Sequence, residues 1–151
     1  MTARPENVIL TGFMGTGKTT VGRRVAAMLG RPFVDMDALI EERAGMPIPE
    51  IFCREGEARF RAWEAELCGE LAGQTDLVVA TGGGALVSDE NRRVLSQRGL
   101  VVCLGCRPDA MAGRLGTGAS RPMLSGDDLA VRTRELLAQR LPAYQRIPFH
   151  I

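Results

Sequence analysis

The sequence predicts an α/β fold in which a central, mostly parallel five-stranded sheet is flanked by helices on both faces. Short apolar runs alternate along the chain with segments of helical period, a pattern typical of covered parallel sheets. A glycine-rich segment joins the first apolar run to the first helical segment. The length of 151 residues suffices for one buried core, so we expect a single domain over 1–151.

The first half of the chain contains two expected strands, at 7–11 and 32–35, and four expected helices, at 18–29, 37–44, 49–54 and 57–72. Gly30 is a typical stop signal for the first helix. The apolar stripe expected on that helix is Val21, Val25 and either Met28 or Leu29. The last of the four helices carries a stripe that we expect in the core: Phe60, Trp63, Leu67 and Leu71.

The second half has expected strands at 76–80 and 100–104 and the start of another at Pro148. A helix is expected at 88–97, with Ser88 as its N-cap and Gly99 ending it. Further helices are expected from Pro108 and over 128–145, where Pro142 should kink or end the helix. The Gly/Ser/Thr-rich stretch between Gly116 and Asp127 is typical of a mobile surface loop.

The composition argues against several classes of protein. The net charge is +1 and arginine is dispersed, so a general nucleic-acid binder is not expected. The apolar runs are far shorter than the roughly 20 residues of a membrane-spanning helix, and we expect a cytoplasmic protein. Four cysteines fit structural thiols better than a metal or redox site, because the Cys103–Cys106 pair has no second pair or histidine cluster to complete it.

A phosphate-binding motif lies between the first strand and the first helix. Residues 12–19 match GxxxxGK[ST], in which backbone N–H groups and the helix N-terminus hold a polyphosphate. Lys18 would reach the β- and γ-phosphates, and the Thr19 hydroxyl would bind Mg²⁺. Lys18 is also the only lysine beside 18 arginines, so no Asn-Lys-x-Asp guanine-binding element exists. The residues expected to bind nucleotide here are Gly15, Thr16, Gly17, Lys18, Thr19 and Thr20.

Asp35 and Asp37 follow the second strand at its carboxyl end, where open α/β sheets bind ligands. Strand alternation would send both side chains in the same direction. One carboxylate could serve the metal and the other could orient or deprotonate a substrate hydroxyl. The simpler alternative is an N-cap followed by a solvated loop residue.

The chain resembles the shikimate kinase family along almost its whole length. The resemblance rests on an ordered set of segments: 12–20, 33–41, 51–52 with 56–61, 80–84, 121–124 and 140–144. It implies a three-layer P-loop kinase fold, a substrate-binding helical segment at about 37–63 and a lid at about 115–127. It also implies a monomer that uses ATP and Mg²⁺ to phosphorylate the 3-hydroxyl of shikimate, a small anionic polyol, in aromatic amino acid biosynthesis.

The resemblance also implies roles for individual residues. Asp37 would bind substrate hydroxyls and act as the candidate base, while Asp35 would act on the Mg²⁺ side. Arg61 and Arg140 would hold the substrate carboxylate, an anion that guanidinium binds bidentately. Glu64, one turn after Arg61, would pair with it. The remaining implied residues are Gly82, Gly83 and Gly84 beside the substrate, the catalytic Arg121 on the lid, and Arg114 near the adenine.

Two other functions stay open at this stage. A sensor domain of the same fold would bind its ligand without turnover, and a relative such as gluconate kinase would use another acceptor. The arginine pair with the three glycines favours shikimate. The family pattern also continues past the strand at Pro148 with a loop and a helix that this chain lacks. Either the chain is shortened or it comes from a longer fused enzyme, and we expect it to bind ATP weakly on its own.

Overall fold

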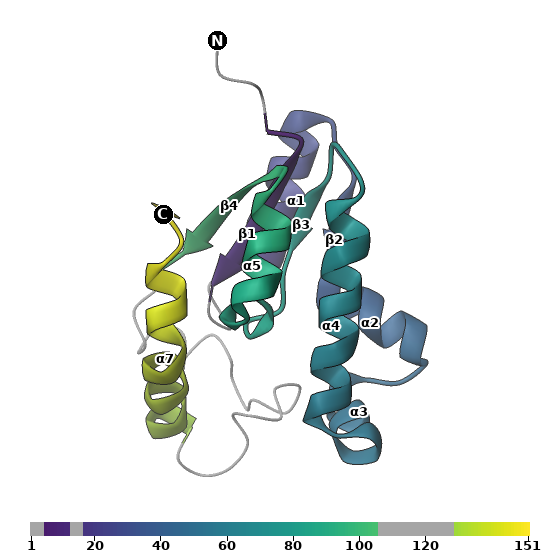
Figure 1. Ribbon diagram of the computed structural model, residues 1–151, viewed down its shortest axis with the longest axis vertical. Helices are drawn as coiled ribbons and strands as arrows, with labels where there is room; N and C mark the ends of the chain where they lie inside the picture. The colour runs from purple at the N-terminus through teal and green to yellow at the C-terminus, as the bar shows by residue number, and fades with distance from the viewer. Residues whose placement is uncertain (1–4, 13–16, 106–128) are drawn as a thin grey trace.

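The computed structural model describes residues 5–12, 17–105 and 129–151, and these form one sheet with the strand order β2-β3-β1-β4-β5 (Figure 1). Each neighbouring pair of strands is parallel. The strands are β1 (Asn7–Gly12), β2 (Phe33–Asp35), β3 (Val78–Ala80), β4 (Gly99–Leu104) and β5 (Phe149–His150). The predicted fold class is confirmed, and the sheet is wholly parallel.

Helices cover both faces of this sheet, with α1 on one side and α5, beside α4, on the other (Figure 1). The helices are α1 (Lys18–Leu29), α2 (Met36–Ala44), α3 (Ile48–Glu55), α4 (Glu57–Ala72), α5 (Asp89–Ser96) and α7 (Leu129–Gln145), with the short 3₁₀ helix η1 (Ala85–Val87). In the described part of the chain, no helix has both the length and the apolar character needed to cross a membrane. Because α1, α2 and η1 follow β1, β2 and β3 in the chain, the carboxyl ends of these strands lie beside the first turns of these helices.

The core is one cluster in which α4 packs together with residues of the sheet and of α2, α3, η1 and α5. Phe60, Leu67 and Leu71 are buried there and Trp63 is half-buried, so the stripe predicted for this helix is confirmed. Asn7 joins the C-terminal end of α4 to the sheet. Its side-chain N–H donates a hydrogen bond of 2.9 Å to the Gln74 carbonyl, and its side-chain oxygen accepts one of 3.0 Å from the Leu77 N–H.

The buried face of α1 differs from the prediction. Its buried residues are Gly22 and Ala26, and a Cβ added to Gly22 would lie only 2.4 Å from Cε2 of Phe33 on β2. Small residues let α1 approach the sheet closely, so large apolar residues do not mark its contact face. The predicted stripe is half-buried or exposed instead: Val21, Val25, Met28 and Leu29.

Two predicted boundaries, at residues 76 and 99, are also wrong. The third strand begins at Val78 and not at residue 76, because Asp76 has a φ of 60° and cannot be extended. Gly99 does not end a helix but begins β4, opposite Asn7. The predicted end of the last helix at residue 145 is confirmed: α7 continues past the exposed Pro142 to Gln145, so of the two expected effects of this proline an early end is excluded. The prediction that Ser88 caps α5 is confirmed: its hydroxyl oxygen accepts a hydrogen bond of 3.2 Å from the Asn91 N–H.

Candidate active site at the carboxyl ends of the strands

Asp35 joins the end of β2 to the start of α1. Its Oδ2 accepts a hydrogen bond of 2.9 Å from the Thr19 hydroxyl, and its Oδ1 accepts one of 3.1 Å from the Ala38 N–H. Asp35 is thus the N-cap of α2, as the simpler alternative held. Its second oxygen nevertheless meets Thr19, so the two residues predicted for the metal lie together.

Lys18 opens α1 directly after Gly17, whose φ of 88° is left-handed. Its Nζ donates a hydrogen bond of 2.7 Å to the carbonyl of Gly12 at the end of β1. The ammonium group is therefore held at the residue where the predicted phosphate loop begins. Thr20 is exposed in the same first turn of α1. Gly15 and Thr16 lie outside the described residues.

Asp37 lies in the first turn of α2 and not at a strand end, so strand alternation does not apply to it. A Cβ added to Gly82 would lie 2.6 Å from Oδ1 of Asp37 and 3.1 Å from Oε2 of Glu64. A side chain at 82 would therefore have to displace the Asp37 carboxylate and would press against Glu64. The carboxylates of Asp37 and Glu64 therefore converge on the bare backbone that follows β3.

Arg61 of α4 lies against the same turn, two residues later. A Cβ added to Gly84 would be 2.6 Å from Nη1 of Arg61. This Nη1 donates a hydrogen bond of 2.7 Å to Oε1 of Glu64, and Nη2 lies 3.4 Å from Oε1 of Glu57. Burial lowers the pKa of Arg61, but the two carboxylates outweigh it and the pKa is raised overall. The predicted Arg61–Glu64 pair is confirmed. The guanidinium of Arg61 is positively charged, and the two carboxylates hold it in place.

Glu64 is the most deeply buried charged residue of this group, with 1% of its surface exposed. Burial raises its pKa, Arg61 opposes this, and the nearby Asp37 carboxylate raises it further. A buried carboxylate is costly without a partner. Arg61 is that partner, so each of the two side chains fixes the position of the other.

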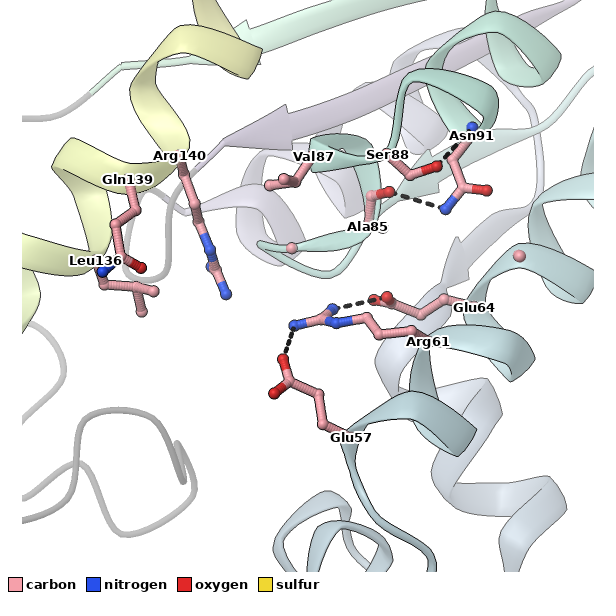
Figure 2. Close-up of a pocket in the computed structure, with 12 residues that line it drawn as sticks. Glu57, Arg61, Glu64, Ala85, Val87, Ser88, Asn91, Leu136, Gln139 and Arg140 are labelled. Atoms are coloured by element: carbon pink, nitrogen blue, oxygen red, sulfur yellow. Dashed lines mark hydrogen bonds and ion pairs between the residues drawn. The ribbon is translucent and has the colours of Figure 1, made fainter.

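Arg61 and Arg140 line one cavity of about 390 Å³ and extend toward each other across it, the first from α4 and the second from α7 (Figure 2). Arg140 is 6% exposed. Burial lowers its pKa, and so does the like charge of Arg61. Asp37 is not among the lining residues, whose polar members are Glu57, Arg61, Glu64, Ser88, Asn91, Gln139 and Arg140.

Tyr144 also belongs to this region, although no role is predicted for it from the sequence. Its hydroxyl donates a hydrogen bond of 2.5 Å to the carbonyl of Gly83. The Arg140 guanidinium lies close enough to this hydroxyl for each group to affect the pKa of the other. The signals in the sequence are its place in the segment 140–144, which is part of the resemblance described above, and its position one helical turn after Arg140. Without the fold, nothing connects it to the three glycines.

Several predicted features lie outside the described residues: Arg114, Arg121, the lid at about 115–127, the helix expected from Pro108, and Cys106. In the part of the chain that is described, Cys68 and Cys103 are buried free thiols. Burial raises the pKa of Cys68 to about 12, so it is not a reactive thiolate. That part also contains no cluster of three or more His, Cys, Asp or Glu residues placed to hold a metal.

Comparison with known proteins gives a consistent result. The family model described as "Shikimate kinase" matches residues 14–151. A shikimate kinase from Halorhodospira halophila is 47% identical over 143 residues, which cover 95% of this chain and 81% of the relative.

Solved structures agree with this. A shikimate kinase from Acinetobacter baumannii in complex with shikimate has a TM-score of 0.93 and 42% identity, covering 97% of this chain and 83% of that one. A gluconokinase from Sinorhizobium meliloti has a TM-score of 0.51 and 20% identity, covering 94% of this chain and 93% of that one. The second likeness shows a shared fold alone.

Proposed function

The chain belongs to the shikimate kinase family, and we propose that it transfers the γ-phosphate of ATP to the 3-hydroxyl of shikimate, giving shikimate 3-phosphate and ADP. One observation of this chain's own geometry carries the proposal. Arginines from two helices that are far apart in sequence extend into one cavity beside a turn of three glycines. A small carboxylate is the ligand that such a pair suits, because guanidinium forks onto it.

Arg61 and Arg140 hold the substrate carboxylate in this proposal. Glu64 and Glu57 fix the Arg61 side chain before substrate arrives, so little side-chain entropy is lost on binding. The turn at Gly82, Gly83 and Gly84 supplies backbone without side chains, which lets the ring of the substrate approach.

Asp37 binds the acceptor hydroxyl and receives its proton. The hydroxyl oxygen forms the new bond to the γ-phosphorus while the bond from that phosphorus to the leaving oxygen of ADP breaks. The proton passes to an oxygen of Asp37 and then to water. The support for this assignment is the position of Oδ1 of Asp37 beside Gly82, next to the residues that line the cavity.

The nucleotide phosphates are held at the loop that Lys18 follows. Lys18 contacts the β- and γ-phosphates as a compact point charge, and backbone N–H groups of the loop contribute with Gly15, Thr16, Gly17 and Thr20. Arg121 closes over the phosphates and Arg114 lies near the adenine; both roles rest on the family motif alone.

Thr19 and Asp35 fit a Mg²⁺ ion. The hydroxyl and the carboxylate oxygen lie 2.9 Å apart, and both are the hard oxygen donors that Mg²⁺ prefers. Two protein oxygens are enough, because Mg²⁺ keeps waters and takes phosphate oxygens for its other positions. When bound, the ion would neutralise charge on the phosphates.

A coupled ADP-release assay with shikimate, quinate and gluconate as separate acceptors tests the function. We expect turnover with shikimate and little with gluconate. Binding of shikimate without ADP release would instead support a sensor domain, and preferred turnover of gluconate would support the sugar-acid kinase.

Arg61→Ala tests the assigned carboxylate contact. We expect the KM for shikimate to rise about 10- to 100-fold, the usual effect of losing a charge-assisted hydrogen bond, with a much smaller change in kcat. Arg93→Ala is the matched control, because this exposed arginine of α5 pairs only with Glu90 among the described contacts. An unchanged KM for shikimate in Arg61→Ala would count against the assignment.

The cellular setting is part of the same proposal. We place the enzyme in the cytoplasm, as a monomer in aromatic amino acid biosynthesis, with ATP and shikimate as its ligands and without nucleic-acid or membrane partners. Size-exclusion chromatography with light scattering would measure the oligomeric state, and a dimer at micromolar concentration would contradict the monomer.

A further inference from the structure

Tyr144 connects α7 to the glycine turn. It is the chain's only tyrosine and is 3% exposed. Its hydroxyl donates 2.5 Å to the carbonyl of Gly83, a residue 61 positions earlier. Both partners belong to the region around the cavity, but neither lines it. The contact therefore acts on the shape of the site from outside the space that a substrate would fill.

The same hydroxyl also meets Arg140, one helical turn earlier on α7. The guanidinium of Arg140 lies close enough to the phenol oxygen for each group to affect the pKa of the other. A tyrosine hydroxyl has one hydrogen to donate and lone pairs to accept with, so it can donate to Gly83 and accept from Arg140 at the same time. The result is a short relay from Arg140 through Tyr144 to the backbone of Gly83.

The relay addresses an electrostatic problem of the site. Arg61 and Arg140 carry like charges and extend toward each other, and this repulsion is among the causes that lower the pKa of Arg140. Glu57 and Glu64 hold Arg61, whereas Tyr144 offers Arg140 a neutral oxygen. Burial raises the pKa of Tyr144 to about 12, so the hydroxyl keeps the proton that it donates to Gly83.

We propose that Tyr144 is a positioning residue for the acceptor substrate: its hydroxyl sets both the direction of the Arg140 guanidinium and the position of the Gly83 backbone. This inference rests on the proposed function, in which Arg140 binds the shikimate carboxylate. Tyr144 does not touch the substrate. It keeps two substrate-binding groups, one on α7 and one in the turn after β3, at a fixed separation.

Tyr144→Phe is the direct test, because it removes only the hydroxyl. The expected result is a KM for shikimate, and a calorimetric Kd, raised about 10-fold or more, since one buried hydrogen-bond relay to a charged group is lost. The KM for ATP should stay within about twofold, because Lys18 and its loop are not part of the relay. An unchanged KM for shikimate in a folded variant would overturn the proposal.

A control variant and a double-mutant cycle distinguish a positioning role of Tyr144 from a general loss of protein stability. Leu71→Val deletes one methylene from the core at the end of α4 remote from Arg61, and should lower the Tm without changing the KM for shikimate. Tyr144→Phe in an Arg140→Ala background should change that KM far less than in the wild type, because contacting residues are not additive. Full additivity, or an equal rise in KM for Leu71→Val, would contradict the proposal.

A spectroscopic measurement covers the case in which Tyr144→Phe does not fold. Incorporating 3-fluorotyrosine labels Tyr144 alone, because the chain has no other tyrosine. Its ¹⁹F signal should shift on titration with shikimate and stay unchanged with ADP. No shift at saturating shikimate would overturn the inference.

The inference and the function fail in different ways. A wild-type chain that neither binds nor phosphorylates shikimate would reject the proposed function, and the inference with it. An active wild type and an equally active Tyr144→Phe would reject the inference alone.

Discussion

At the residue scale, Asp37 is the group whose chemistry can be isolated most cleanly. Asp37→Asn keeps the size of the side chain and removes its basicity. We expect kcat to fall about 10²- to 10⁴-fold, the usual contribution of a positioned general base, with a smaller change in the KM for shikimate. Stopped-flow or coupled assays measure this, and turnover near that of the wild type would reject Asp37 as the proton acceptor.

Tyr144 also makes a prediction for alkaline stability. Its pKa is raised from 10 to about 12, mainly by burial, so the folded state keeps the proton over a range where the unfolded chain releases it. A raised folded pKa gives stability that is complete below pH 10 and is lost as the pH rises toward 12. Relative to Tyr144→Phe, the wild type should lose about 1.4 kcal/mol of unfolding free energy between pH 9 and pH 11.

Denaturant melts of both proteins across that range provide the measurement. Cys68, whose pKa is also raised to about 12, titrates in both proteins, and its contribution cancels in the difference. Parallel pH profiles for the wild type and Tyr144→Phe would show that the hydroxyl titrates normally, against the burial that the fold gives it.

At the element scale, α1 and α4 each contain a glycine whose replacement by alanine should change the stability of the protein, in opposite directions for the two helices. Gly22→Ala on α1 brings a methyl within 2.4 Å of the Phe33 ring and should destabilise the protein by about 1–3 kcal/mol. Gly69→Ala on α4 meets nothing within 4 Å and should stabilise it by up to about 1 kcal/mol, the normal helix preference.

Thermal melts of the two variants check the signs. Phe33→Leu should restore part of the loss in the Gly22→Ala background, because it removes the ring that the methyl meets. A Gly22→Ala variant as stable as Gly69→Ala would show that α1 can move away from β2 at little cost.

The same elements show what the sequence could predict. The ranges of α1 and α4 were predicted in full, because glycines or a turn bound a clear helical period. The buried face of α1 was not, since Gly22 and Ala26 carry no apolar signal and only the nearby Phe33 explains them. The glycines at 82 and 84 were predicted as bare backbone by a substrate, while the side chains that face them belong to α2 and α4 and depend on the tertiary fold.

At the scale of the whole molecule, the cavity is lined by α4, the region from Gly84 to α5, and α7, so it exists only when distant parts of the chain have folded together. Ligand binding should therefore stabilise the molecule as a unit. Shikimate at about 100 times its Kd should add about 2.7 kcal/mol of unfolding free energy. For a chain of this size we expect the Tm to rise by about 5–10 °C.

Differential scanning fluorimetry with shikimate measures that rise. Arg140→Ala should lose most of it, whereas Arg93→Ala should keep it. Acetate at the same ionic strength is the control for a general salt effect. An equal shift in the wild type and Arg140→Ala would mean that shikimate binds elsewhere.

The contacts of the glycine turn also constrain how the sequence can drift over evolutionary time. The space that a methyl at position 84 would need is filled by the guanidinium of Arg61, and the space at position 82 is filled by Asp37. A glycine replacement at either position has to displace the end of the facing side chain, Arg61 at 84 or Asp37 at 82. A lineage that moves toward an uncharged acceptor should therefore lose Arg61 first and acquire a side chain at 84 afterwards, and the reverse order should pass through a protein in which Arg61 is displaced and shikimate binds more weakly.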